Sequence, residues 1–200
     1  MRKYFLFMLL LFGAGWFMFG GKTEIKNVGN PGKNIVAFGD SLTAGYGAGK
    51  DRAYPAVLGQ MVNRPVINLG LSGDTAANAP SRLPQVLQAE PYMVLIEFGG
   101  NDYMRGVSFA QTEQAIRQIV DEVQSAGAIA VLVDTGGYPA MGRYTKLYKQ
   151  IAKEKQALFV PGILDGIFGK SKYKADPIHP NAAGYEMVAQ KVHKAIKPYL

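Results

Sequence analysis

The chain of 200 residues contains no cysteine, and it has only two histidines, His179 and His193. The absence of cysteine excludes disulfide bonds, thiolate metal sites and a lipid-modified N-terminal cysteine. With two histidines and no His-Glu-x-x-His sequence, a dedicated transition-metal site is not expected. We therefore expect no metal and no cofactor, and any chemistry that needs an imidazole must use one of two residues.

The sequence also lacks internal repeats and low-complexity tracts. Its share of apolar residues, 48%, and of charged residues, 18%, is ordinary for a globular protein, which argues against disorder. A chain of this length can bury most of its apolar surface in one core. We expect a single folded domain.

Acidic residues are few relative to basic ones, and the formal net charge is +7. Many of the lysines lie between Lys146 and Lys197, on helical and loop segments without a base-reading motif, so we expect no nucleic acid partner. A solvated basic face explains the charge, and such a face could also meet the anionic head groups of a membrane surface. We expect a small-molecule or lipid ester as the substrate. We also expect the protein to be a monomer.

The one long apolar run lies at the N-terminus. Arg2 and Lys3 precede an uncharged segment, 4–21, so residues 1–21 are predicted to form a signal peptide or an N-terminal membrane anchor. The bulky Trp16 and Phe17 disfavour a small-residue cleavage site, which favours an uncleaved anchor.

The charge pattern and composition around this segment predict the location and the domain boundaries. The positive N-terminus predicts export to the periplasmic side, with the protein either anchored to the inner membrane or released after cleavage. Residues 22–33 are rich in glycine, asparagine and lysine and are predicted to be a linker. The folded domain is then expected at 34–200.

Five short apolar runs in this domain predict buried strands: 35–38, 66–69, 93–98, 129–133 and 158–160. Apolar residues spaced three and four apart predict helices between and after these runs: 112–125, 144–155 and 182–197. Strands that alternate with helices imply a parallel sheet covered on both faces. The predicted fold class is α/β, a three-layer α/β/α sandwich with a five-stranded parallel sheet.

Ligands bind such sheets beyond the carboxyl ends of the strands, so polar residues there are the first candidates for a site. Ser41 follows the first run at a glycine-flanked turn, where a hydroxyl would be exposed. His179 lies in a loop before the last helix and is the better candidate base, whereas His193 falls inside the helix. Asp176 precedes His179 by three residues and can orient its imidazole. These residues predict nucleophilic catalysis at Ser41.

The segment 176–181 can also be explained as a turn that caps the last helix, with Asn181 as the cap, and both roles are compatible. Asp40 and Asp102 are expected to brace loops by hydrogen bonds rather than to react. The glycine-rich segment 45–50 lacks the spacing and the Ser or Thr of a phosphate loop, so nucleotide binding is not expected.

Four segments together resemble the conserved blocks of the GDSL or SGNH hydrolase family. They are Phe38-Gly39-Asp40-Ser41-Leu42-Thr43, Ser72-Gly73-Asp74-Thr75, Gly99-Gly100-Asn101-Asp102 and Asp176-Pro177-Ile178-His179-Pro180, and their order and spacing match along 34–198. Within the family, the chain is most similar to the bacterial periplasmic thioesterase I (lysophospholipase L1) group and related arylesterases.

The resemblance implies a flavodoxin-like SGNH hydrolase fold and a function for each block. Ser41 would be the nucleophile, His179 the base and Asp176 its orienting partner. The backbone amides of Ser41 and Gly73 and the side-chain amide of Asn101 would form the oxyanion hole. The implied activity is that of a serine esterase that hydrolyses carboxylic esters or thioesters through an acyl-enzyme, without a cofactor.

The segment 134–139 departs from what the thioesterase I group leads us to expect, and a loop at this place helps to shape the acyl pocket there. The acyl-chain preference is therefore left open. Two alternatives also stay open: a carbohydrate O-acetyl esterase or acyltransferase that acts on envelope polysaccharide, and a non-catalytic anchored binding domain. The Gly-x-Ser-x-Gly elbow of α/β-hydrolases is absent, because Thr43 stands where its second glycine would be.

Overall fold

The five predicted apolar runs form the five strands of one parallel sheet in the order β2-β1-β3-β4-β5. The computed structural model describes residues 24–200, so the segment 1–21 that we predict to be a signal peptide or anchor lies outside the described residues. The strands are β1 (Asn34–Gly39), β2 (Val66–Gly70), β3 (Pro91–Glu97), β4 (Ile129–Val133) and β5 (Leu158–Val160).

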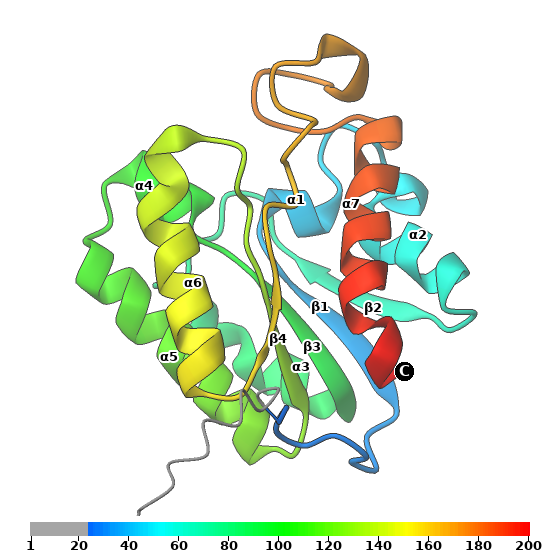
Figure 1. Ribbon diagram of the computed structural model, residues 1–200, viewed down its shortest axis with the longest axis vertical. Helices are drawn as coiled ribbons and strands as arrows, with labels where there is room; N and C mark the ends of the chain where they lie inside the picture. The colour runs from blue at the N-terminus through cyan, green and yellow to red at the C-terminus, as the bar shows by residue number, and fades with distance from the viewer. Residues whose placement is uncertain (1–23) are drawn as a thin grey trace, which may run out of the picture.

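Helices cover both faces of this sheet, as Figure 1 shows. The α-helices are α1 (Ser41–Ala44), α2 (Tyr54–Met61), α3 (Leu83–Gln88), α4 (Gly100–Arg105), α5 (Phe109–Ser125), α6 (Gly142–Glu154) and α7 (Ala182–Ile196). Short 3-10 helices are η1 (Lys50–Arg52), η2 (Ala79–Arg82), η3 (Pro139–Met141), η4 (Ser171–Tyr173) and η5 (Lys197–Tyr199). The predicted α/β sandwich is thereby confirmed.

Two apolar clusters hold the three layers together. Alternate residues of β1, β3 and β4 point to opposite faces, so that Val36 and Ile96 pack against α3, α5 and α6, while Ile35 and Leu95 pack against α2 and α7. All five residues of β4 are fully buried, as a strand covered on both faces requires. Each buried side chain of this kind contributes about 1.5 to 3 kcal/mol.

The strand order reverses direction between β1 and β3, because β1 lies in the sheet between β2 and β3. At such a switch point the connections leave in opposite directions and open a crevice beyond the carboxyl ends of the two strands. The segments that follow β1 and β3 begin with Asp40 and Phe98. The fold therefore brings the first and third sequence blocks to this crevice.

Residues 24–33, most of the predicted linker, lie against the domain. The Asn27 side-chain amide donates to the carbonyls of Gln124 and Ala128 at 2.8 and 2.9 Å, and the Lys26 N–H donates to the Gln156 carbonyl at 2.9 Å. None of the helices within 24–200 combines the length and the apolar character needed to cross a membrane.

Candidate active site

Ser41 is the first residue of α1, directly after β1. Asp40 caps this short helix, since its Oδ1 accepts a hydrogen bond of 3.0 Å from the Leu42 N–H. A Cβ atom at Gly39 would overlap the Thr43 hydroxyl and the Glu97 carbonyl. Only glycine therefore allows the strand to turn this tightly into the helix that carries Ser41.

His179 lies between Ser41 and Asp176. Its Nε2 is 3.0 Å from Ser41 Oγ, and its Nδ1 is 2.7 Å from Asp176 Oδ2. The other oxygen of Asp176 accepts hydrogen bonds of 2.8 Å from the N–H groups of Ile178 and His179. Partial burial opposes the charge of Asp176, but the hydrogen bonds from His179 and from these two N–H groups hold its pKa below the ordinary value. An ionised Asp176 fixes the tautomer and orientation of the imidazole.

The loop that carries His179 is tied to the last helix. Asn181 caps α7 by accepting a hydrogen bond of 3.1 Å from the Gly184 N–H, and its amide group donates to the Lys172 carbonyl at 2.9 Å. The Tyr46 ring contacts the imidazole, with ring centroids 4.5 Å apart. The predicted cap at Asn181 is confirmed, and it coexists with the hydrogen bonds of His179.

Asn101 follows β3 as the second residue of α4 and is 8% exposed. Its Nδ2 donates to Asp40 Oδ2 at 3.0 Å, which links the first and third sequence blocks. A side-chain amide nitrogen carries two hydrogens, so the second remains available to a ligand. Ser41 and Asn101 both line the pocket described below.

Gly73 lies in the turn after β2, with a φ angle of 82° in the left-handed region that favours glycine. A Cβ atom there would come within 2.9 Å of an Arg105 guanidinium nitrogen. Gly73 is not among the residues that line the pocket, unlike Ser41 and Asn101.

The loop that contains Gly73 is held by two buried acids. Arg82 donates to Asp74 Oδ2 through Nε at 2.9 Å and Nη2 at 2.6 Å, and to the Leu69 carbonyl at 2.9 Å. Asp102 accepts from the Ala76 N–H at 2.8 Å and from the Thr112 hydroxyl at 3.1 Å. Asp102 therefore braces loops, as the sequence predicts.

A pocket of about 220 Å³ opens beside Ser41 and His179. Beyond these two residues its walls are mostly apolar. The other lining residues are Asp40, Leu42, Gly100, Asn101, Tyr103, Met104, Thr135, Tyr138, Ala140, Met141, Leu164 and Ile178. Thr135 and Tyr138 belong to the segment 134–139 in which the sequence departs from expectation. The Tyr138 ring packs on Phe168 with centroids 3.7 Å apart, so this segment forms a wall of the pocket.

Two buried carboxyl groups lie next to Ser41: Asp40 belongs to the turn itself, and Glu97 contacts this turn from the end of β3. Burial raises the pKa of Asp40 to about 6, against the hydrogen bond from the Leu42 N–H. Burial, and then the neighbouring Asp40, raise the pKa of Glu97 well above its ordinary value. Sequence reasoning missed Glu97. The signal that could have found it is an acidic residue inside an otherwise apolar strand.

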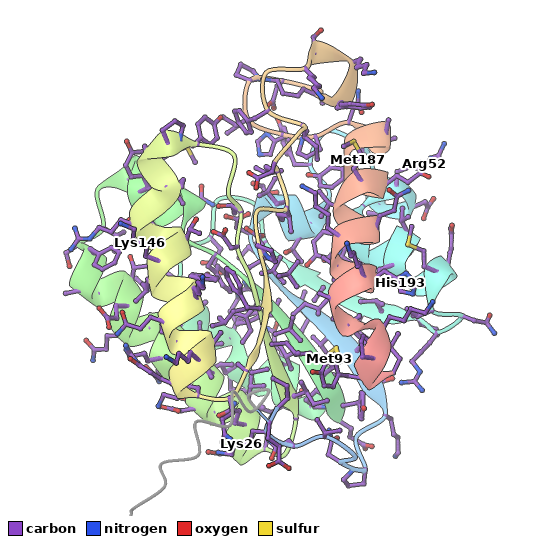
Figure 2. All side chains as sticks on the ribbon, viewed as in Figure 1. Lys26, Arg52, Met93, Lys146, Met187 and His193 are labelled. Atoms are coloured by element: carbon purple, nitrogen blue, oxygen red, sulfur yellow. The ribbon has the colours of Figure 1, made fainter. Side chains whose placement is uncertain are left out.

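His193, the second histidine, lies on α7, where Figure 2 labels it, and is partly buried. Among residues 24–200, the hydrogen bond between an imidazole and Ser41 comes from His179 and not from His193. Within 24–200, no three His, Asp or Glu side chains come together in a way that could hold a metal ion.

The chain is similar to known hydrolases along most of its length. The profile of the GDSL-like lipase/acylhydrolase family matches residues 37–187. The chain is 34% identical over 173 residues to thioesterase 1/protease 1/lysophospholipase L1 of Escherichia coli, covering 82% of this chain and 83% of that protein. It is 29% identical over 182 residues to an arylesterase of Vibrio mimicus, covering 84% of this chain and 90% of that protein.

A solved structure gives the same result for the fold. The crystal structure of TesA superposes with a TM-score of 0.78 at 31% sequence identity, covering 84% of this chain and 100% of that chain.

Proposed function

Since the chain belongs to the GDSL-like lipase/acylhydrolase family, and therefore acts on ester bonds, we propose that it does so as a serine esterase with Ser41 as nucleophile, His179 as base and Asp176 as the partner of His179. The single observation that carries this proposal is the position of the imidazole, 3.0 Å from the Ser41 hydroxyl on one side and 2.7 Å from the Asp176 carboxylate on the other. A hydroxyl becomes a competent nucleophile when a neighbouring base can take its proton.

The proposed reaction is an acyl transfer in two steps. Ser41 Oγ forms a bond to the carbonyl carbon while its proton passes to His179 Nε2, and the tetrahedral intermediate then expels the alcohol or thiol, which receives that proton. A water molecule next attacks the acyl-enzyme, gives a proton to His179 and releases the acid, and Ser41 recovers its proton. Asp176 stabilises the imidazolium that exists between these transfers.

The developing oxyanion would be held by the N–H groups of Ser41 and Gly73 and by the Asn101 side-chain amide. The Asn101 amide is buried and fixed by its hydrogen bond to Asp40, which supports this role, because donors that are already oriented need no reorganisation during the reaction. No metal or cofactor enters any step.

Apolar pocket walls favour the acyl chain as the part of the substrate that the pocket binds. Met104, Met141 and Leu164 would contact a short to medium alkyl chain, whereas a sugar would need hydrogen-bonding groups at these positions. We therefore favour carboxylic esters and thioesters of short to medium acyl chains, lysophospholipids included, over acetyl esters of glycans.

The proposed partners and location follow from the sequence. Membrane-derived lipid esters would be within reach if residues 1–21 direct export and anchor the domain on the periplasmic side. Four exposed apolar side chains, Tyr46, Leu71, Tyr103 and Met104, suit contact with a lipid surface. We also propose that the protein is a monomer and that it does not bind nucleic acid.

The test is hydrolysis of a p-nitrophenyl ester series from acetate to palmitate by the protein and by its Ser41→Ala, His179→Ala and His193→Ala variants. We expect turnover that is lost in the first two variants and kept in the third, which controls for the loss of an imidazole. The chain-length optimum distinguishes an acetyl esterase from a lipid-directed enzyme. Turnover that survives Ser41→Ala would contradict the proposed nucleophile, and a folded protein without turnover would favour a glycan-specific or binding function.

A further inference from the structure

Glu97 is the last residue of β3, and its side chain is completely buried beneath the turn that carries Ser41. Glu97 Oε2 accepts hydrogen bonds from the Thr43 hydroxyl at 3.0 Å and from the Asp40 N–H at 3.4 Å. Glu97 Oε1 is buried without a hydrogen-bond partner among the described residues. The proposed mechanism makes no use of this carboxyl group.

The surroundings of Glu97 do not suit a negative charge. No ion pair in the part of the chain that the structure describes includes Glu97. Arg82 donates to the Gly39 carbonyl near Glu97, but its guanidinium group forms an ion pair with Asp74 and not with Glu97. The closest acidic neighbour, Asp40, would repel a second carboxylate. A buried charge without a cation and with one unpartnered oxygen is far more costly than the neutral acid.

We propose that Glu97 is a positioning residue for Ser41: its carboxyl group, protonated and neutral, fixes the β1–α1 turn through the Thr43 hydroxyl and the Asp40 N–H. This inference rests on the proposed function of Ser41. The two contacts lie one residue before and two residues after Ser41. They therefore restrain the backbone on both sides of the nucleophile and direct its hydroxyl toward His179.

Hydroxyl groups extend the hydrogen bonds of Glu97 Oε2 into the fold. Thr43 Oγ1 lies 3.4 Å from the hydroxyl of Tyr54, which is also fully buried. Each of these hydroxyls can donate one hydrogen bond and accept another, so Glu97, Thr43 and Tyr54 form a chain that joins β3, α1 and α2. Because the Thr43 hydroxyl donates to Glu97 Oε2, its oxygen can accept from the Tyr54 hydroxyl, and the chain ends at the carboxyl group of Glu97.

The neutral state of Glu97 also serves Asp40. Two adjacent carboxylates cannot both ionise without a large cost, so the proton on Glu97 leaves the charge on Asp40. Asp40 then accepts hydrogen bonds from Leu42 and Asn101 as an anion, which makes both bonds stronger. The same proton thus supports the Ser41 turn and the orientation of the Asn101 amide.

The other titratable groups around Glu97 are phenols. Tyr54 lies on α2, Tyr148 on α6 and Tyr185 on α7, and burial raises the pKa of each, so all three stay neutral around neutral pH. Asp40, in the β1–α1 turn, is the acidic group that borders Glu97.

Steady-state kinetics with the best p-nitrophenyl ester tests the positioning role. We expect Glu97→Gln, which keeps a neutral hydrogen-bonding side chain, to retain kcat within about threefold. Glu97→Leu and Thr43→Val should each lower kcat by roughly tenfold to a hundredfold with KM nearly unchanged, because a small displacement of the nucleophile affects the reaction more than binding. Glu122→Gln, at a partly exposed position of α5 whose carboxyl group accepts from Gln118, is the matched control and should have no effect on kcat.

A double-mutant cycle tests the route through Thr43. If Glu97 acts through the Thr43 hydroxyl, the variant with both Thr43→Val and Glu97→Leu should be no slower than the slower single variant. Multiplicative losses in kcat, or an unchanged kcat in Thr43→Val, would overturn this route. Should Glu97→Leu fail to fold by circular dichroism, Thr43→Val alone decides, because an unchanged kcat in that variant would overturn the route.

Infrared spectroscopy of the intact protein gives a readout that does not depend on activity. At pD 8 exposed carboxyl groups are ionised, so we expect one carbonyl band of a protonated carboxyl group that disappears in Glu97→Gln. Absence of that band, or a loss of kcat in Glu97→Gln as large as in Glu97→Leu, would overturn the proposal. Turnover that does not depend on Ser41 would contradict the proposed function instead, while the band would still report the state of Glu97.

Discussion

At the scale of single residues, the Asn101 amide can use both of its hydrogens. One hydrogen donates to Asp40 at 3.0 Å, and the other is free for an oxyanion. Asn101→Ala should lower kcat by roughly a hundredfold to a thousandfold, about 3 to 4 kcal/mol of transition-state stabilisation, with little change in KM. Hydrolysis of the preferred p-nitrophenyl ester measures both parameters.

The control for this prediction is Asn78→Ala, which removes an exposed asparagine from the neighbouring loop. It should leave kcat unchanged. A loss in Asn101→Ala that appears mainly in KM would contradict the role as an oxyanion donor and would point to binding of the substrate in its ground state.

Glu97 provides a prediction about stability and pH. Its pKa is raised in the folded protein, mainly by burial, so above the unfolded pKa of about 4.3 the folded state holds a proton that the unfolded state has lost. This makes the wild-type protein less stable as pH rises through the window between the unfolded and folded pKa values. Glu97→Gln removes that dependence, and its stability relative to wild type should increase by about 1.4 kcal/mol per pH unit within the window.

Chemical denaturation at pH 5, 6 and 7 measures this difference, since each midpoint and slope gives a free energy of unfolding. A difference between Glu97→Gln and wild type that stays constant over these three pH values would show that Glu97 is ionised in the folded protein. It would also contradict the neutral acid that we infer beneath Ser41.

The residues that could be predicted from the sequence share a simple physical property. Ser41, His179 and Asp176 lie at turns whose neighbours in the sequence define the geometry, and the structure brings these three together. The contact between Asp40 and Asn101 joins positions 61 residues apart, and that between Thr43 and Glu97 joins positions 54 apart. Local patterns carry no information on such pairs, which form only when the sheet is assembled.

At the scale of elements, all five strands could be predicted because each is a short apolar run that the parallel sheet buries. The long helices α5, α6 and α7 could also be predicted, because their apolar stripes repeat over several turns. The helices α1, α3 and α4 have four to six residues, too few for a periodic pattern. The eight-residue α2 has no side-chain cap at its start and contains a glycine.

The loop after β2 depends on one ion pair. Side chains of Arg82 and Asp74 are 17% and 5% exposed, and Arg82 also donates to the carbonyls of Leu69 and Gly39 at the ends of β2 and β1. Arg82→Met should lower the free energy of unfolding by about 3 to 5 kcal/mol, because Asp74 is left as a buried charge without a partner. Denaturation in urea measures the loss.

A double variant distinguishes the cause of this loss. Arg82→Met combined with Asp74→Asn removes the unpaired charge and should recover much of the stability. If the double variant is as unstable as Arg82→Met alone, the hydrogen bonds from Arg82 to the strand ends are the larger contribution. Arg117, which pairs with Glu113 and Glu154 on the surface, is the control site, and Arg117→Met should cost less than about 1 kcal/mol.

At the scale of the whole molecule, the site gathers groups from both halves of the chain. The turn with Ser41 follows β1, the Asn101 amide follows β3, and the loop with His179 leaves β5 and enters α7 (Figure 1). Each group is held by hydrogen bonds to a different part of the fold, so the geometry of the site requires the completed sheet. Activity and global folding should therefore be lost together on denaturation.

The N-terminal segment gives the last prediction. Residues 24–33 are fastened to the domain by Asn27, by Asn30, whose amide donates to the Tyr92 carbonyl at 3.1 Å, and by Lys33, which pairs with Glu90. A chain that begins at Glu24 keeps all of these contacts and should have the same kcat and thermal stability as the full chain.

If residues 1–21 anchor the protein, the full chain should sediment with membranes and resist extraction with carbonate, while the chain from Glu24 should stay in the supernatant. If expression of the full sequence instead yields a protein of reduced mass in the supernatant, the N-terminal segment is a cleaved signal peptide, and the measured mass gives the cleavage site.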